Sequence, residues 1–176
     1  MNREKNRNII LIGMPGSGKS TLGVLLAKAL GRRFVDTDLL IQEREGRLLQ
    51  DIIDNDGIEK FLQIEEQVLL SVDVEHAVIA TGGSVVYEPN AMAHLSQLGT
   101  VVYLKLGYKA LARRLGNLEK RGVVLRPGQT LRMLYDERVP LYEQYAHITV
   151  DCGGQDIEHT LRRVRRALEK QGNVTK

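Results

Sequence analysis

One octapeptide near the start of the chain constrains the fold more than any other feature. Residues 13–20 read Gly-Met-Pro-Gly-Ser-Gly-Lys-Ser and fill every fixed position of the phosphate-binding pattern G-x-x-x-x-G-K-[ST]. An apolar run, residues 8–12, precedes the glycines, and leucines at helical spacing follow them in residues 21–30. Strand, glycine loop and helix therefore occur in the order that a phosphate-binding loop requires. The alternative, a glycine-rich turn before an ordinary helix, leaves the matching flanks unexplained.

This loop predicts a site for a nucleoside triphosphate and Mg²⁺. The backbone N–H groups of such a loop and the N-terminus of its helix bind phosphate oxygens. Lys19 is expected to reach the outer phosphates, and the Ser20 hydroxyl to be a ligand of Mg²⁺. We assign nucleotide binding to Gly13, Pro15, Gly16, Ser17, Gly18, Lys19, Ser20 and Thr21.

The composition is that of an ordinary globular protein and excludes several classes. Of 176 residues, 43% are hydrophobic and 27% are charged, which suits a single domain over residues 1–176. The single cysteine, Cys152, excludes an internal disulfide framework and suits a reducing cytoplasm. The early apolar run breaks at Gly13, too soon for a membrane span or a secretory signal. We expect a cytoplasmic protein with no membrane partner.

The net charge of +3 comes from 25 lysines and arginines against 22 acidic residues. Part of the excess lies in the last expected helix, at Arg162, Arg163, Arg165 and Arg166. No aromatic or turn motif typical of a nucleic-acid surface accompanies this cluster. We interpret it as the solvated face of a terminal helix and predict no nucleic-acid partner.

Apolar segments alternate with amphipathic ones along the chain. The segments expected to be strands are residues 8–13, 33–37, 77–82, 100–106 and 147–151. Helical stretches between and after them include residues 19–30, 57–71, 91–98, 109–115 and 157–170. This alternation predicts an α/β protein, with a five-stranded parallel sheet covered by helices on both faces. Ligands of such sheets bind beyond the carboxyl ends of the strands, so functional residues are expected just after residues 13, 37, 82 and 106.

Two insertions interrupt the alternation. Residues 38–72 contain two or three short helices where one crossover would suffice. Residues 117–130 are polar, punctuated by glycine and rich in basic residues. Beside a phosphate site, such a segment is a candidate mobile lid that closes over the reacting groups. A disordered surface loop is the alternative interpretation.

Two aspartates, Asp36 and Asp38, end the second expected strand. Side chains two residues apart on a strand point the same way, so both carboxylates are expected on one side of the chain. Phosphoryl transfer uses carboxylates to support Mg²⁺, often through water, and to orient or deprotonate the accepting hydroxyl. Asp38 could alternatively cap a helix that starts at Leu39, a role compatible with catalysis.

Two further segments carry weaker signals. Gly82 and Gly83 follow the third strand, where glycines let a ligand approach the backbone closely. Arg138 lies just before a helix interruption expected at Pro140, and an arginine there could bind a carboxylate bidentately. A tight turn and a surface arginine are the respective alternatives.

Together these segments resemble the shikimate kinase family, within the nucleoside-monophosphate-kinase-like branch of P-loop proteins. The match runs in order over most of the chain, at residues 13–21, 34–38, Gly57 with Phe61 and Glu65, 79–83, 102–104, Leu111 with Arg114-Leu115, and Glu137-Arg138 with Pro140-Leu141-Tyr142. The resemblance implies a three-layer α/β/α P-loop fold with a helical acceptor-binding subdomain at about residues 38–72 and a lid at about residues 117–130.

The resemblance also implies the roles of individual residues. Lys19 would bind the β- and γ-phosphates of ATP, and Ser20 and Asp36 would hold Mg²⁺, the aspartate through water. Asp38 would hold and activate the acceptor hydroxyl. Arg126 would steady the transferring phosphoryl group as the lid arginine, which makes Lys19, Asp38 and Arg126 the implied catalytic residues. The reaction would convert shikimate to shikimate 3-phosphate in aromatic amino-acid biosynthesis.

For the substrates, the resemblance places Arg114 against adenine and Arg138 on the acceptor's carboxylate. Acceptor binding is assigned to Asp38, Leu62, Glu65, Gly82, Gly83, Ser84 and Arg138. Two of these positions depart from the family pattern, because Leu62 replaces an arginine and Ser84 replaces the third glycine of a triplet. The lid and the segment after the fifth strand also differ, since Arg126-Pro127 lacks the usual Leu-Leu that follows and residues 151–155 offer no second arginine for adenine.

Leu62 leaves a second acceptor open. Without an arginine at that position, Glu65 could meet the ammonium of an amino-acid acceptor, of which homoserine is the plainest candidate. Two other classes are also considered. A GTPase switch is disfavoured because the chain contains no Asn-Lys-x-Asp motif. A nucleotide-binding module without kinase activity is disfavoured by the presence of Lys19, Ser20, Asp36 and Asp38. We expect a monomeric, ATP- and Mg²⁺-dependent kinase of a small hydroxy acid.

Overall fold

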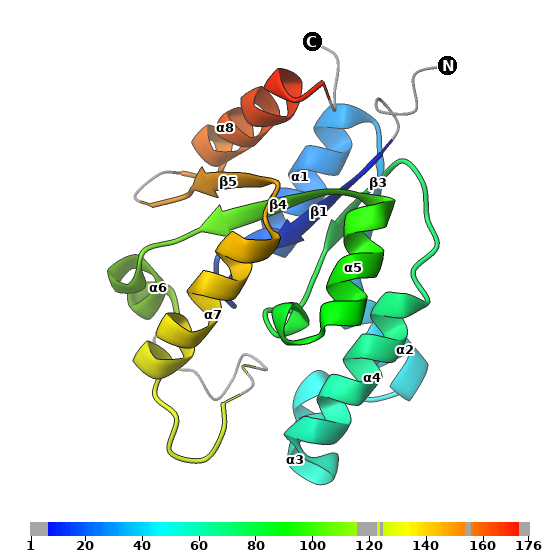
Figure 1. Cartoon of the computed structure of the whole chain (residues 1–176), viewed down its shortest axis with the longest axis vertical. Coiled ribbons are helices and arrows are strands. Elements are labelled where there is room, and N and C mark those ends of the chain that lie inside the picture. The colour runs from blue at the N-terminus through cyan, green and yellow to red at the C-terminus, as the bar shows by residue number, and fades with distance from the viewer. Residues whose placement is uncertain (1–6, 116–122, 124, 154–155, 173–176) are drawn as a thin grey trace.

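A five-stranded parallel sheet forms the centre of the protein. The computed structural model describes residues 7–115, 123, 125–153 and 156–172. The strands pair in the order β2-β3-β1-β4-β5. They are β1 (Asn8–Ile12), β2 (Arg33–Asp36), β3 (Ala77–Ala80), β4 (Gly99–Lys105) and β5 (Ile148–Asp151). Every pairing is parallel, which confirms the predicted sheet. Since β1 lies in the middle, the glycine loop that follows it emerges at the centre of the sheet's carboxyl edge (Figure 1).

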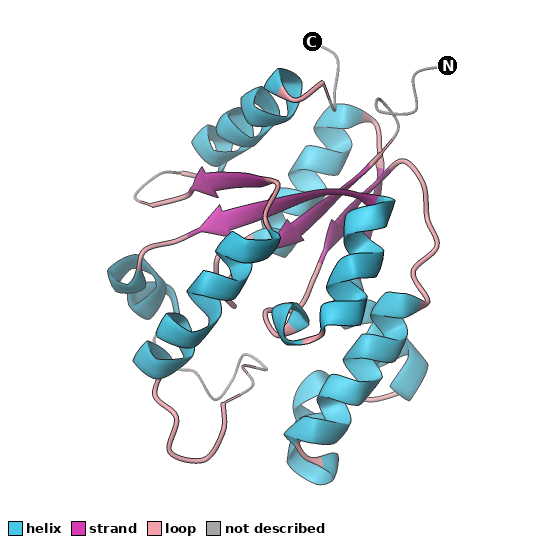
Figure 2. Cartoon of the chain, viewed as in Figure 1, coloured by secondary structure: helices cyan, strands magenta, loops and turns pink. Residues whose placement is uncertain are grey.

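Helices cover both faces of this sheet and complete three layers (Figure 2). On one face, α1 (Lys19–Leu30) and α8 (Ile157–Lys170) share an apolar core with Ile9 and Leu11 of β1. On the other face, α5 (Pro89–Leu98) and α7 (Leu131–Tyr145) share a core with Ile10 and Ile12. Side chains alternate along a strand, so the fully buried β1 contributes to both cores.

Three short helices occupy the insertion expected at residues 38–72. They are α2 (Thr37–Glu45), α3 (Leu49–Asp56) and α4 (Ile58–Leu70). They pack around an apolar cluster of their own, which consists of Ile41, Ile52, Phe61, Ile64 and Val68. The three helices therefore have a small core separate from the two on the sheet.

The remaining elements are the 3₁₀ turn η2 (Val85–Tyr87) and helix α6 (Tyr108–Leu115). The helix interruption predicted at Pro140 is wrong, because α7 continues through this proline to Tyr145. Proline removes the hydrogen bond to the carbonyl four residues earlier, at Asp136. Both Asp136 and Pro140 are exposed, so water can solvate that carbonyl and the helix is retained.

Half of the predicted lid lies outside the described residues, at 117–122 and 124. Its last part, residues 125–130, leads into α7. Among the helices in the described ranges, none is long and apolar enough to cross a membrane.

Candidate active site

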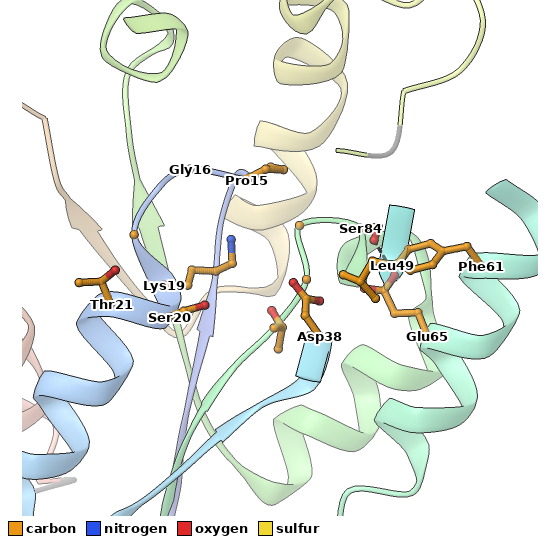
Figure 3. A pocket seen from close by; sticks show the side chains of 14 residues that line it. Pro15, Gly16, Lys19, Ser20, Thr21, Asp38, Leu49, Phe61, Glu65 and Ser84 are labelled. Carbon is orange, nitrogen blue, oxygen red and sulfur yellow. Dashed lines mark hydrogen bonds between the residues drawn. The ribbon is translucent and has the colours of Figure 1, made fainter. Parts of the chain in front are cut away.

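The glycine loop connects β1 to α1 at the carboxyl edge of the sheet (Figure 3). Gly13, Gly16 and Gly18 have φ values of 148°, 77° and 98°, in a region that residues with side chains rarely adopt. Helix α1 begins directly after Gly18 without a side-chain cap. The N–H groups of its first turn are therefore left for a ligand, and a helix N-terminus favours an anion such as phosphate.

Lys19 is buried inside this loop. Its ammonium donates hydrogen bonds to the carbonyls of Gly13 at 2.8 Å and Met14 at 3.0 Å. Burial lowers the pKa of Lys19 to about 8, while the negative charges of Asp38 and Asp36 oppose that shift. The cation of the loop and the two aspartates after β2 thus lie within electrostatic range of one another, as predicted.

The two aspartates reach this position by a different geometry from the one predicted. Strand β2 ends at Asp36 and α2 begins at Thr37, so the two side chains do not share one strand. Asp36 is the N-cap of α2, and its Oδ1 accepts a hydrogen bond of 3.0 Å from the backbone N–H of Asp38. The alternative in which Asp38 caps a helix starting at Leu39 is therefore wrong, because the helix begins two residues earlier.

The pKa of the Asp38 carboxyl group is raised above its ordinary value. Burial raises the pKa of Asp38 to about 6, the nearby charge of Asp36 acts in the same direction, and Lys19 acts against it. Near neutral pH this carboxyl is still mostly ionised. It is therefore more basic than an ordinary aspartate and still able to accept a proton, as a general base requires.

A cavity of about 350 Å³ connects the glycine loop to the carboxyl edge of β3 and to helices α2–α4 (Figure 3). Its lining comprises Pro15, Gly16, Gly18, Lys19, Ser20, Thr21, Asp38, Leu49, Phe61, Glu65, Thr81, Gly82, Gly83 and Ser84. The predicted loop, Asp38 and the glycine pair are thus brought together around one space. Leu49, Phe61 and Thr81 were not predicted as site residues. Phe61, one turn before Glu65, and Thr81, adjacent to Gly82, were the two that local spacing could have found.

Glu65 and Ser84 form a buried pair in the wall of this cavity. The Ser84 hydroxyl donates a hydrogen bond of 2.6 Å to Oε2 of Glu65. Burial raises the pKa of Glu65 to about 7, although this hydrogen bond acts in the opposite direction. Gly82 lies against the same carboxyl group, since a Cβ built there would be 2.4 Å from Oε1 of Glu65 and 2.9 Å from Oδ1 of Asp38. A side chain at position 82 would therefore displace the carboxyl group of Glu65 or of Asp38.

Arg138 lies behind the second glycine. It is fully buried, and its Nε donates a hydrogen bond of 3.1 Å to the hydroxyl of Tyr87. A Cβ built on Gly83 would lie 3.1 Å from Nη1 of Arg138. The guanidinium therefore adjoins the backbone that lines the main cavity, a position suited to binding a carboxylate.

A smaller hollow also adjoins Arg138. It is lined by Ile58, Leu62, Tyr87, Arg126, Gln129 and Arg138. Leu62 packs against the apolar cluster of α2–α4 and gives this hollow an apolar wall. Arg126 is exposed and lies 3.7 Å from Glu137, with its guanidinium 5.9 Å from the centroid of the Tyr87 ring. Tyr87 was not predicted as a site residue.

A second cavity, of about 220 Å³, also adjoins the glycine loop. It is lined by Ser17, Gly18, Thr21, Leu22, Arg114, Cys152, Ile157 and Thr160. Arg114 bridges α6 to the loop, and its Nη1 donates to the carbonyls of Gly16 at 3.4 Å and Ser17 at 3.3 Å. Cys152, which follows β5, and the two residues from α8 were not predicted, because nothing in their local sequence marks them. Functional residues were expected just after residue 106. The structure instead places Arg114, on the helix that follows, at this cavity.

The side chains near the glycine loop include oxygen ligands suited to Mg²⁺. In the described part of the chain, no group of three or more His, Cys, Asp or Glu side chains could hold a metal ion. Mg²⁺ at nucleotide sites keeps several waters and needs only one or two protein ligands beside the phosphates. The exposed hydroxyl of Ser20 and the partly buried carboxylate of Asp36 therefore fit such an ion as a donor set.

The chain is similar to a family of known proteins. The family described as shikimate kinase matches residues 15–169. A shikimate kinase of Mycobacterium tuberculosis (strain ATCC 25177 / H37Ra) is 39% identical over 163 residues, which cover 89% of this chain and 92% of the relative. One of Paracidovorax citrulli (strain AAC00-1) is 37% identical over 171 residues, which cover 94% and 93% of the two chains.

Solved structures show the same relationship. The shikimate kinase from Acinetobacter baumannii, in complex with shikimate, has a TM-score of 0.85 and 31% identity, and 96% of each chain is covered. A sugar kinase from Janibacter sp. HTCC2649 has a TM-score of 0.60 at 16% identity, a likeness of fold alone. Homoserine as the acceptor, a GTPase switch and a module without kinase activity find no support among these relatives. The chain belongs to the shikimate kinase family of phosphotransferases, for which ATP is the co-substrate.

Proposed function

We propose that this protein transfers the γ-phosphoryl group of ATP to a ring hydroxyl of shikimate, giving ADP and shikimate 3-phosphate. The observation that supports this best is the shared cavity of Lys19 and Asp38, which joins the phosphate loop to a pocket between the sheet and α2–α4. A phosphoryl donor and a hydroxyl acceptor can therefore meet in one enclosed space. The similar Acinetobacter baumannii enzyme is known in complex with shikimate, so its name supplies the acceptor.

In this proposal the acceptor oxygen forms a bond to the γ-phosphorus as the bond from that phosphorus to the β–γ bridging oxygen breaks. Asp38 orients the acceptor hydroxyl and takes its proton, and Lys19 stabilises the negative charge on the phosphates. Ser20 and Asp36 would hold Mg²⁺, which neutralises phosphate charge when bound. ADP then leaves with the bridging oxygen.

Three arginines complete the proposed site. Arg138 binds the carboxylate of the acceptor from behind Gly83, where burial strengthens the interaction. Arg126, at the end of the lid, meets the transferring phosphoryl group. Arg114 lines the cavity that receives adenine, together with Thr160 and Ile157.

We further propose that residues 38–72 bind the acceptor as a subdomain and that residues 117–130 close over the site, all within one domain. The separate apolar cluster of α2–α4 supports the first part, since a unit with its own core can shift against the sheet without opening it. Binding of Mg²⁺, a monomeric state and a cytoplasmic location belong to the same proposal. Light scattering of the purified protein tests the oligomeric state.

A coupled assay of ADP release tests the function. We expect ATP consumption to rise with shikimate and to saturate, while homoserine has little effect. Leu62→Arg should lower the KM for shikimate, because a second guanidinium would adjoin Arg138 in the small hollow. Saturable turnover with homoserine and none with shikimate would refute the proposal, and ATP hydrolysis that ignores every acceptor would contradict kinase activity.

A further inference from the structure

A tight turn carries the chain from Arg126 directly to the start of α7 (Figure 1). The backbone N–H of Gln129 donates to the carbonyl of Arg126 at 2.9 Å, which closes a β-turn over residues 126–129. Pro127 occupies the second position and Gly128, with a φ of 77°, the third, a combination typical of a type II turn. Proline fixes its own φ, and glycine adopts a positive φ without strain. The local sequence therefore sets the path of the main chain after Arg126.

The side chain of Gln129 binds this turn to α7. Its Oε1 accepts a hydrogen bond of 3.1 Å from the backbone N–H of Arg126, and its Nε2 donates one of 3.0 Å to Oε2 of Glu137. Thr130 follows as the N-cap of α7, and its hydroxyl accepts from the backbone N–H of Met133 at 3.2 Å. One amide thus joins the main chain at Arg126 to the side of a capped helix.

Glu137 connects Gln129 to two arginines. Its Oε1 lies 3.7 Å from Nη1 of Arg126 and accepts a hydrogen bond from the hydroxyl of Tyr87 at 2.5 Å. That hydroxyl in turn accepts from Nε of Arg138. The guanidiniums of Arg126 and Arg138 lie 5.9 Å and 4.9 Å from the centroid of the same tyrosine ring. Two positive charges this close repel each other, so the carboxylate of Glu137 stabilises the arrangement.

The main chain and the guanidinium of Arg126 are held to different degrees. The turn and Gln129 fix the main chain through two hydrogen bonds. The side chain is 54% exposed, and Arg126 lines the small hollow beside Arg138 but is not among the described residues that line the main cavity. Its guanidinium therefore has to rotate away from Glu137 to meet a phosphoryl group near Lys19, whereas its backbone can stay on α7.

We propose that Gln129 is a positioning residue for phosphoryl transfer, which keeps the main chain of Arg126 on α7 so that only the guanidinium moves to meet the phosphoryl group. An arginine whose backbone is already placed loses less conformational freedom at the transition state than one on a free loop. Gln129 itself touches neither substrate and acts through Arg126. This inference rests on the proposed function, since it concerns how one of the proposed catalytic groups is held.

The first experiment measures turnover of shikimate by Gln129→Met, which keeps the length of the side chain and removes both of its hydrogen bonds. We expect kcat to fall by about tenfold, because a small misplacement of a catalytic group slows the reaction strongly. The KM for shikimate should change by less than about twofold, since the contact between Tyr87 and Arg138 remains. In an Arg126→Ala background the same substitution should not lower kcat further, because residues that act through one group are not additive.

The second experiment exchanges the two hydrogen-bonded side chains. The double variant Gln129→Glu with Glu137→Gln places the carboxylate on the turn and the amide on α7. The carboxylate can still accept from the N–H of Arg126 and from the amide, whose oxygen can accept from Tyr87. This variant should recover most of the kcat, whereas Gln129→Glu alone sets two carboxylates against each other and should be as slow as Gln129→Met. Gln144→Met is the matched control, since Gln144 is exposed on α7 outside this network, and should equal the wild type.

The inference is wrong if Gln129→Met has the kcat of the wild type, or if it lowers kcat by the same factor with and without the Arg126 guanidinium. It is also wrong if the exchanged variant stays as slow as Gln129→Glu, because the hydrogen-bonded pair would then not be what places Arg126. The melting temperature checks that each variant is folded. Failure of the proposed function looks different, because the wild type would then release no ADP in response to shikimate.

Discussion

Arg138 and Tyr87 contact each other twice. Nε of Arg138 donates a hydrogen bond to the Tyr87 hydroxyl at 3.1 Å, and the guanidinium lies 4.9 Å from the centroid of the tyrosine ring. The same hydroxyl donates to Glu137 at 2.5 Å, and Glu137 in turn lies 3.7 Å from Arg126. One tyrosine on η2 therefore holds the proposed carboxylate-binding arginine and connects it to Arg126, at the end of the proposed lid.

Tyr87→Phe removes the hydroxyl and keeps the ring. A hydrogen bond to a charged group contributes about 1.5–3 kcal/mol, so the KM for shikimate should rise by about tenfold or more. The kcat should change by less than about twofold, because Tyr87 acts through Arg138 and does not touch the reacting atoms. Tyr135→Phe is the control, since that hydroxyl donates to the Leu106 carbonyl away from the site. Equal effects of the two variants would contradict a positioning role for Tyr87.

Lys19→Ala and Asp36→Asn should abolish phosphoryl transfer while the protein still folds. Burial of the Lys19 charge is unfavourable, so replacing this side chain by alanine costs little apolar packing. Asparagine also caps helices, so Asp36→Asn keeps the start of α2 while it removes the carboxylate. Turnover is measured beside the circular dichroism spectrum and melting temperature. Near-normal turnover in either variant would remove that residue from the mechanism.

Arg126→Ala should lower kcat far more than it weakens ATP binding. An arginine that meets charge developing in the transition state acts mainly there. The substitution also breaks the contact to Glu137, an exposed pair that contributes little to stability. The measurement compares kcat with the Kd for ATP. Equal losses in both, or no loss, would instead identify a surface residue.

The rate should depend on pH through Asp38 and Lys19. Asp38 must be ionised to accept a proton, and its pKa is raised to about 6, so kcat/KM for shikimate should fall as the pH drops below 6. Lys19 must be protonated, and its pKa is lowered to about 8, so kcat/KM for ATP should fall above pH 8. Bound phosphates raise the pKa of a nearby ammonium, so the alkaline decline should be absent from kcat at saturating ATP. An acid limb near pH 4 would show that Asp38 is not the base.

Glu65→Gln should change the pH dependence of stability. The pKa of Glu65 rises from an ordinary 4.5 to about 7 on folding, so its stabilising contribution is complete below pH 4.5 and is lost as the pH rises through 7. Glutamine does not titrate. The melting temperature of the variant relative to the wild type should therefore increase between pH 4.5 and pH 8. The corresponding change in the free energy of unfolding has an upper limit on the order of 3 kcal/mol. A difference that is constant with pH would mean that Glu65 titrates normally.

The sequence by itself determined the sheet, the phosphate loop and two of the helices that flank the sheet. Helices α1 and α8 have the predicted bounds, and the strands agree within two residues. These elements are encoded locally, because strand hydrophobicity, glycine conformation and helical periodicity each depend on neighbours in the chain. The sequence also marked Asp36 and Asp38 locally, although the N-cap of α2 is Asp36 and not Asp38, which was the alternative considered.

Only the tertiary structure decided the chemistry of the acceptor pocket. Ser84 meets Glu65 across 19 residues, and Arg138 meets Tyr87 across 51. Neither pairing leaves a periodic signal, since each joins side chains from two elements that the parallel sheet brings together. The continuation of α7 through Pro140 likewise depended on solvent exposure, which local sequence does not report. The shift of Glu65 toward a neutral acid has the same origin, because burial is a property of the packed fold.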